Sequence, residues 1–280
     1  MNILDLISKG SYKLKNNSIL SYRLDSEILL SKVLEKSRER VIIDQEEKVC
    51  KERLFKFNIL IKRRSRKEPI AYILNEKEFW SKKFLVNKNT LIPRPETELM
   101  VEKLVEINKD KSISILDIGT GSGCIIISLL SELKNASGIG IDICRKAVLV
   151  AKKNAKFHSL TSNLKFYCKP VQKIFNKKFD LVVSNPPYIQ SRDIRDLDED
   201  VKNYEPLVAL DGGNDGLDVI KKVIYKAKEI LKINGMLAIE IGKGQSKKVS
   251  KILNKNKFTI VYRIKDFKNN IRCIISKLKR

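Results

Sequence analysis

Residues 184–189 read Ser-Asn-Pro-Pro-Tyr-Ile and follow an apolar run, 179–183, that we predict to be a buried strand. Pro186 and Pro187 donate no backbone hydrogen bonds and fix φ at about −65°. The chain must therefore leave the sheet rigidly, with Asn185 and Tyr188 flanking a stiff corner. Such a corner can hold one flat, polar group from two sides. The pattern indicates a site for a planar nitrogen group, an amide or an amine.

A second group of residues lies in a glycine loop, Asp117-Ile118-Gly119-Thr120-Gly121-Ser122-Gly123, which follows a strand and opens a helix. Glycines at such a turn let the backbone approach a ligand closely. A Walker loop would end in Gly-Lys-Ser/Thr, and a dinucleotide fingerprint would place its third glycine where Cys124 stands. The Asp-x-Gly-x-Gly-x-Gly that is present resembles the loop of S-adenosyl-L-methionine-dependent methyltransferases.

Asp142 ends the next predicted strand, 19 residues beyond Gly123. An acidic residue there can accept hydrogen bonds from both ribose hydroxyls of a nucleoside, and the alternative interpretation is a helix cap. Ligands of open α/β sheets lie outside the carboxyl ends of the strands. Because Gly119, Asp142 and Asn185 all fall at such ends, the sequence predicts one shared crevice.

Alternating strands and helices position these residues from about residue 96 onward. Apolar runs at 113–118, 138–141, 181–183 and 236–241 predict a mostly parallel sheet covered by helices on both faces. Two C-terminal strands, 259–264 and 271–276, should form an antiparallel pair at the sheet edge.

The residues before this domain have a different sequence pattern. Residues 1–67 show helical periodicity, with Asp25 as the expected cap of a second helix, and predict a small helical substrate-recognition domain. Residues 68–95 read as a hairpin-like connector whose strands are 71–74 and 84–86. The third part, 96–280, is the predicted methyltransferase domain, with Pro95 near its first helix start.

Composition limits the class of protein. No apolar run approaches the length of a membrane span, and the N-terminus lacks the layout of a signal peptide. Five scattered cysteines favour reduced thiols in the cytoplasm and no metal site. The net charge of +24 has its densest cluster at 62–67, which is either a solvated helix face or a contact with an acidic or ribosomal partner. The spread of lysine, isoleucine and asparagine is also typical of an AT-rich genome.

Further motifs extend the resemblance over essentially the whole chain. The connector and the later loops are similar to those of the release factor glutamine methyltransferase family, which methylates the glutamine amide nitrogen (N5) of the Gly-Gly-Gln motif in class I peptide-chain release factors. The residues that carry this similarity are Glu68-Pro69-Ile70-Ala71-Tyr72-Ile73, Glu78-Phe79-Trp80, Leu91-Ile92-Pro93-Arg94-Pro95-Glu96-Thr97-Glu98, Tyr204-Glu205-Pro206, Ala209-Leu210, Asp211-Gly212-Gly213 and Asp215-Gly216-Leu217.

The resemblance implies a role for each site residue. The side-chain oxygen of Asn185 and the backbone carbonyl of Pro186 would accept the two N–H bonds of the target amide, with Pro187 and Tyr188 completing the substrate surface. S-adenosyl-L-methionine would lie against Asn185 and the following residues: Asp117, Gly119, Thr120, Gly121, Ser122, Gly123, Asp142 and Pro170. The implied partner is a class I release factor, and we expect a monomer with no membrane and no stable nucleic-acid partner.

One stretch departs from the family pattern. Lys169-Pro170 stands where an acidic residue and a large aromatic usually meet the adenine. Proline cannot stack as an aromatic ring does, so we expect weaker cofactor affinity with activity retained. Two other functions stay open at this point: an adenine N6 methyltransferase acting on nucleic acid, and a noncatalytic module that kept the cofactor fold.

Overall fold

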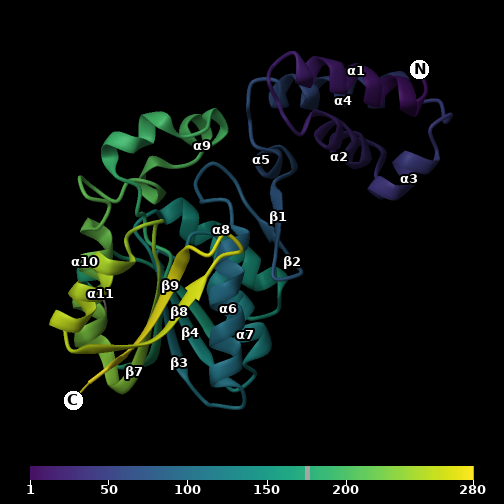
Figure 1. The fold of residues 1–280 in the computed structure, drawn as a ribbon. Coiled ribbons are helices and arrows are strands. Elements are labelled where there is room, and N and C mark those ends of the chain that lie inside the picture. The colour runs from purple at the N-terminus through teal and green to yellow at the C-terminus, as the bar shows by residue number, and fades with distance from the viewer. Residues whose placement is uncertain (174–176, 280) are drawn as a thin grey trace. The chain divides into compact units, whose positions relative to one another are not determined.

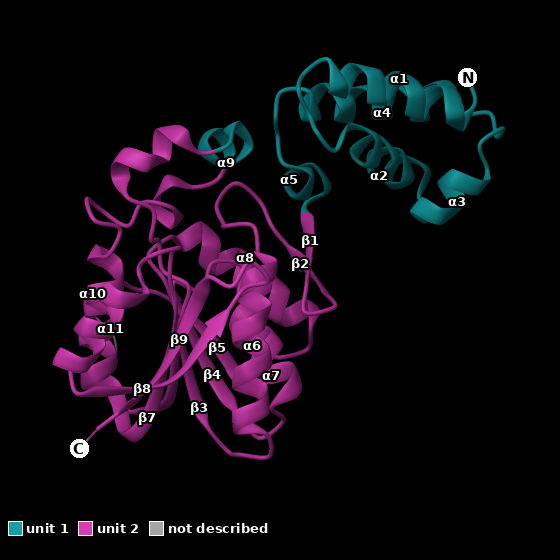
Figure 2. Cartoon of the chain, viewed as in Figure 1, with its two compact units in different colours: residues 1–75, 198–204 teal, residues 76–197, 205–280 magenta. Residues whose placement is uncertain are grey.

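The computed structural model describes residues 1–173 and 177–279 and divides into two compact units (Figure 2). The first unit comprises residues 1–75 and 198–204, and the second comprises 76–197 and 205–280. Among the described residues, no helix combines the length and the apolar character that crossing a bilayer requires.

The first unit is helical. Its elements are α1 (Ile3–Lys15), α2 (Tyr22–Leu34), α3 (Arg38–Ile43), α4 (Lys51–Arg64), α5 (Ile70–Leu74) and α9 (Glu199–Tyr204). An apolar core of leucines, isoleucines and Phe57 holds α1, α2 and α4 together. The expectation that 71–74 forms a strand is wrong, because these residues belong to α5. Pro69 supplies the N-cap of that helix, where its missing N–H is not needed.

Asp25 does not cap the second helix, contrary to the sequence-based expectation. The helix α2 begins at Tyr22, so Asp25 lies within its first turn and is only 4% exposed. Its carboxylate accepts a hydrogen bond of 2.7 Å from Nε of Arg64, which is also buried. Arg63 in turn donates to Glu68 at 2.8 Å. Two cations of the basic cluster 62–67 are thus neutralised within the unit.

The second unit contains a seven-stranded sheet with the order β5-β4-β3-β6-β7-β9-β8 (Figure 1). Strands β5, β4, β3, β6 and β7 are parallel, whereas β9 runs antiparallel to both β7 and β8. The predicted parallel sheet with a C-terminal antiparallel pair at its edge is confirmed. The strands are β3 (Ser114–Ile118), β4 (Ser137–Asp142), β5 (Leu164–Cys168), β6 (Phe179–Ser184), β7 (Leu231–Glu240), β8 (Phe258–Lys265) and β9 (Ile271–Leu278).

Helices cover both faces of this sheet, as its nearly continuous apolar strands require. One core joins the sheet to α6 (Pro95–Asn108), α7 (Cys124–Glu132) and α8 (Arg145–Phe157). The opposite core joins it to α10 (Asp218–Ile230) and α11 (Ser246–Lys255), which lie on the other side of the sheet in Figure 1. Among the described residues of this unit, 3-10 turns lie at Val171–Lys173, Ser191–Asp196 and Leu207–Ala209.

A short antiparallel hairpin, β1 (Glu76–Phe79) and β2 (Lys82–Leu85), precedes α6 and is held by α8. The fully buried Asn154 of α8 accepts from the Leu85 backbone N–H at 2.7 Å and donates to the Leu85 carbonyl at 3.0 Å. The same amide donates to the Ser122 carbonyl at 2.8 Å. One side chain therefore ties the hairpin to the glycine loop.

Candidate active site

A cavity of about 910 Å³ opens at the carboxyl ends of β3, β4 and β6. This is the edge of the sheet where α/β folds of this type bind their ligands, and the volume suits a ligand of nucleoside size. The cavity brings together residues 118–122 of the glycine loop, Asp142, Pro170 and Asn185, whereas Asp117 and Gly123 do not line it. The shared crevice predicted from the sequence is therefore present.

The glycine loop forms one wall of the cavity through backbone atoms. Gly119, Gly121 and Gly123 have φ values of 75°, 55° and 82°, in the left-handed region where other residues are strained. A Cβ added to Gly119 or Gly121 would meet no atom within 4 Å, so both face open space. At Gly123 it would lie 3.0 Å from Ile127. The first two glycines thus give a ligand access, whereas the third permits close packing of the helix.

Asp117 lies beneath this loop and is completely buried. Its Oδ2 accepts from the Thr120 hydroxyl at 2.7 Å, whereas its Oδ1 has no hydrogen-bond partner within the described residues. Burial raises the pKa of Asp117 to about 7, although the Thr120 hydrogen bond opposes this shift. Asp117 does not line the cavity, so it supports the loop from beneath through Thr120, which does line it.

Asp142 ends β4 on the neighbouring wall of the cavity. Its two oxygens accept from the Gly121 N–H at 2.9 Å and the Cys144 N–H at 2.8 Å. Burial raises its pKa, and the backbone donors counteract that shift. Because each carboxylate oxygen can accept two hydrogen bonds, capacity remains for the hydroxyls of a ribose. Asp142 therefore fixes the loop and can still receive a ligand.

The stretch after β5 closes the next side. Lys169 and Pro170 line the cavity, and the Lys169 N–H donates to the Asp142 carbonyl at 2.9 Å. The Lys169 ammonium lies 6.0 Å from the centre of the Tyr167 ring. Pro170 presents a small apolar surface where the resemblance leads one to expect an aromatic ring. The weaker cofactor affinity expected from this exchange stays a prediction.

The Asn-Pro-Pro-Tyr corner follows β6 directly. Ser184, the last residue of the strand, donates its hydroxyl to the Ile118 carbonyl at 2.7 Å and so links the corner to the strand that carries the glycine loop. Asn185 and Pro187 line the cavity. Pro186, which is buried, and Tyr188 do not line it, so the roles of the Pro186 carbonyl and of Tyr188 toward a substrate stay predictions.

A buried acid behind the corner was missed by the sequence analysis. Glu240, the last residue of β7, is 1% exposed and accepts from the Thr97 hydroxyl at 2.6 Å and the Tyr188 hydroxyl at 3.2 Å. Arg272 of β9 donates to the Tyr188 oxygen at 3.2 Å, and Asn185 donates to Thr97 at 3.3 Å. Burial raises the pKa of Glu240, and burial together with the Glu240 charge raises that of Tyr188.

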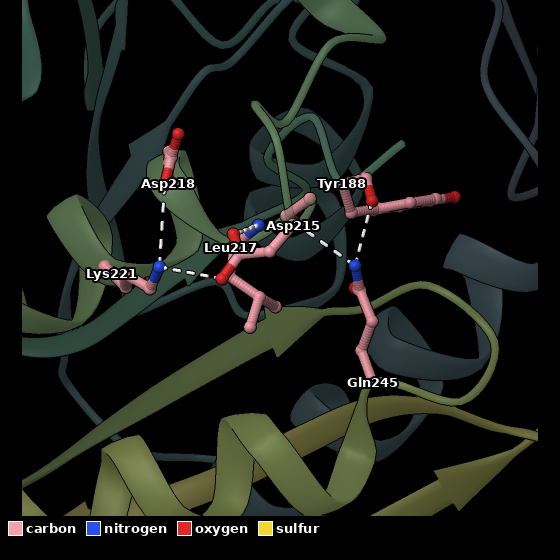
Figure 3. A network of polar contacts seen from close by, with 7 residues as sticks. Tyr188, Asp215, Leu217, Asp218, Lys221 and Gln245 are labelled. Atoms are coloured by element: carbon pink, nitrogen blue, oxygen red, sulfur yellow. Dashed lines mark hydrogen bonds and ion pairs between the residues drawn. The ribbon is translucent and has the colours of Figure 1, made fainter. Parts of the chain in front are cut away.

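Figure 3 shows how the Tyr188 backbone is held. The Gln245 amide donates to the Tyr188 carbonyl at 2.9 Å and to the Gly216 carbonyl at 3.2 Å. Lys221 bridges Asp215 at 2.9 Å and Asp218 at 3.5 Å in the same view. The loop between the corner and α10 is thus held by Gln245, the residue before α11, and by Lys221 of α10.

Comparison with known proteins decides the family. A model described as a methyltransferase domain matches residues 109–269, and one described as the PrmC N-terminal domain matches residues 5–74. A release factor glutamine methyltransferase of Buchnera aphidicola subsp. Schizaphis graminum is 41% identical, with complete coverage of both chains. One from Fusobacterium nucleatum is 39% identical over 98% of this chain and 78% of the relative. The chain belongs to the release factor glutamine methyltransferase family.

Other comparisons agree with this membership. A bifunctional methyltransferase of Rickettsia typhi is 36% identical to this chain. The match covers 98% of this chain and 57% of that relative's length. Among solved structures, the ribosomal protein L11 methylase of Lactobacillus delbrueckii has a TM-score of 0.51 at 19% identity, covering 68% of this chain and 82% of its own. The tRNA m1G37 methyltransferase of M. jannaschii has a TM-score of 0.52 at 19% identity, covering 73% and 56%. Both indicate the methyltransferase fold alone.

Membership of this family identifies the cofactor as S-adenosyl-L-methionine. S-adenosyl-L-methionine, when bound, supplies a methyl group activated by a sulfonium. The open wall at Gly119 and Gly121 and the spare lone pairs of Asp142 fit an amino acid joined to a ribose. These residues are the ones that would hold it.

Proposed function

We propose that this enzyme methylates the side-chain amide nitrogen (N5) of the glutamine in the Gly-Gly-Gln motif of class I peptide-chain release factors, using S-adenosyl-L-methionine. The observation that carries this proposal is the Asn-Pro-Pro-Tyr corner beside the cofactor cavity, in a chain 41% identical to a release factor glutamine methyltransferase over its full length. The modification would act on translation termination.

The corner supplies what an amide nucleophile needs. An amide nitrogen is weakly nucleophilic because its lone pair is delocalised into the carbonyl. Two acceptors, Asn185 Oδ1 and the Pro186 carbonyl, would hold its two hydrogens and favour the positive charge that develops on nitrogen. The nitrogen would gain the methyl group as the methyl–sulfur bond of the sulfonium breaks, leaving a thioether. The methylated, cationic nitrogen would then lose one proton, so no strong base is required before transfer. Tyr188 and Pro187 would confine the flat face of the amide.

The remaining expectations about domains and partners belong to the same proposal. Residues 1–67 would recognise the release factor outside its Gly-Gly-Gln motif, and 68–95 would connect this part to the methyltransferase domain 96–280. A short Gly-Gly-Gln peptide should then be a much poorer substrate than the whole factor. We further propose that the enzyme acts as a monomer in the cytoplasm, with no stable nucleic-acid partner.

Methyl transfer from labelled S-adenosyl-L-methionine tests the function directly. The purified enzyme should label a release factor, and a factor whose motif glutamine is replaced by alanine should stay unlabelled. Duplex DNA is offered in parallel, because an adenine methyltransferase acting on nucleic acid is the rival function. Label in the DNA and none in the release factor would refute the proposal.

Asn185→Ala tests the role of the corner. It should lower turnover by a factor on the order of 100 or more, since one of the two acceptors is lost in a site that works by positioning. Cofactor affinity, measured by calorimetry, should change little. Asn256→Ala is the matched control, because the Asn256 side chain donates to the Ile252 carbonyl at the end of α11, and Asn256 does not line the cavity. Equal turnover of the two variants would show that the amide is held elsewhere.

A further inference from the structure

The side-chain amide of Asn185 has two ends of similar shape, and only one of them can accept a hydrogen bond. A methyl-accepting amide presents N–H donors, so the orientation of the Asn185 side chain decides whether the corner attracts or repels it. Nothing in the Asn-Pro-Pro-Tyr motif itself fixes that orientation. The residues behind Asn185 must do so.

Thr97 is the residue that contacts the Asn185 amide from behind. It lies in the first turn of α6, is 2% exposed, and its hydroxyl oxygen is 3.3 Å from Asn185 Nδ2. A hydroxyl carries one hydrogen, and the Thr97 hydrogen lies on the 2.6 Å bond to Oε2 of Glu240. The Thr97 oxygen can therefore only accept from Asn185. This leaves Asn185 Oδ1 as the end of the amide that is available to a ligand.

Glu240 sets the direction of these hydrogen bonds. Its second oxygen accepts from the Tyr188 hydroxyl at 3.2 Å, and that hydroxyl accepts from Arg272 at 3.2 Å. Every bond in the series thus points toward one buried carboxylate, which can only accept when ionised. Burial raises the pKa of Glu240, whereas the Thr97 and Tyr188 hydroxyls and the charge of Arg272 lower it. Both hydroxyl hydrogen bonds are of the kind that an ionised carboxylate accepts.

We propose that Thr97 and Glu240 are positioning residues that hold the Asn185 side chain with its oxygen toward the target amide. This inference rests on the proposed function and concerns which end of the Asn185 side-chain amide faces the target. In the reversed orientation, Asn185 would oppose an N–H of the glutamine with an N–H of its own. A donor facing a donor inside a water-poor site leaves both unsatisfied. Glu240 would also hold the Tyr188 ring through its other oxygen.

Thr97→Val tests the proposal because valine keeps the shape of threonine and lacks the hydroxyl. The variant should lower kcat/KM for release factor methylation by a factor on the order of 10 to 100, the cost of an unsatisfied donor. Thr97 lines the cavity, but its hydroxyl is engaged by Glu240 and Asn185, so cofactor affinity should stay within about twofold. Thr97→Ser retains the hydroxyl and should keep most of the activity.

Ser276→Ala is the matched control for losing a buried hydroxyl. Ser276 is 0% exposed on β9 and donates to the Leu237 carbonyl, away from the cavity. Its removal should leave kcat/KM near that of the parent enzyme. A Ser276 variant as defective as Thr97→Val would mean that any buried hydroxyl in this sheet has the same effect, which would overturn the positioning role.

A double-mutant cycle separates positioning from general support. If Thr97 acts through Asn185, then Thr97→Val should cause almost no further loss in an Asn185→Ala background, measured over long incubations with labelled cofactor. Equal losses in both backgrounds would overturn the inference. So would a Thr97→Val enzyme as active as the parent, or one that also loses cofactor affinity. A parent enzyme that labels no release factor would instead refute the proposed function.

Discussion

Asp117 should make the free enzyme less stable as the pH rises, and Asp117→Asn should remove that dependence. The carboxyl is fully buried with one oxygen unpartnered, and burial raises its pKa from 3.8 to about 7. Between these two values the folded state holds a proton that the unfolded state has released. The contribution of Asp117 to the unfolding free energy is therefore largest at low pH, and it decreases as the pH rises to about 7.

The size of the effect follows from the shift. Each unit of pKa difference corresponds to about 1.36 kcal/mol, so the parent enzyme should lose roughly 2–3 kcal/mol of unfolding free energy between pH 5 and pH 8 through this group. Asparagine at 117 can still accept from Thr120, and the cost of its buried NH₂ does not vary with pH. The unfolding free energy of Asp117→Asn should therefore increase relative to that of the parent as the pH rises.

Urea unfolding of the cofactor-free protein at several pH values measures this difference. Trp80 is the sole tryptophan and lies in the unit that contains Asp117, so its fluorescence reports the relevant transition. Asp180→Asn is a suitable control. The pKa of Asp180 is lowered: burial opposes the shift, but Lys232 and Ser114 outweigh it, so Asp180 does not titrate in this range. Parallel stability curves for the parent and Asp117→Asn would refute the reasoning.

Three further changes have defined outcomes. Gly121→Ala should weaken S-adenosyl-L-methionine binding by roughly tenfold, because alanine is strained at φ 55° and its methyl enters the cavity; unchanged affinity by calorimetry would contradict this. Asn154→Ala should lower the unfolding free energy by about 2–3 kcal/mol, since one buried and two part-buried hydrogen bonds are lost, and an unaltered urea midpoint would show that water replaces them. Arg64→Met should lower the unfolding free energy by about 3–5 kcal/mol, because Asp25 stays buried without its cation. Adding Asp25→Leu should recover most of this loss, and circular dichroism melts of the parent and both variants measure it.

Much of the second unit could be predicted from the sequence because its strands are continuous apolar runs. Strand β3 occupies 114–118 within the predicted 113–118, and β4 and β6 match as closely. The glycine loop, Asp142 and Asn185 were placed together for a physical reason, since carboxyl ends of parallel strands share one edge. The start of β7 at Leu231 was missed, because polar residues interrupt the pattern before Met236.

The errors and omissions have causes in long-range contacts. Asp25 looked like a helix cap because its partner, Arg64, is 39 residues away and invisible to local patterns. Residues 71–74 looked like a strand because their aromatic and branched side chains suit one, yet they complete the helical core through Ile73. Glu240 did leave a signal: a carboxylate in the otherwise apolar run 236–241 is unusual and indicates a buried partner. Its connection to Thr97, 143 residues away, could come only from the fold.

The hydrogen bonds behind the corner also bear on how the enzyme becomes active during folding. The four bonds that join Asn185, Thr97, Glu240, Tyr188 and Arg272 link residues 52 to 143 positions apart in the chain. None can form within a single hairpin or helical turn, and together they require β6, β7, β9 and α6 to be in place. A partly folded chain could possess a complete glycine loop and still lack an oriented Asn185. Methyl transfer would then require β9 to be paired with β7, and a local opening of that pairing would remove Arg272 from Tyr188.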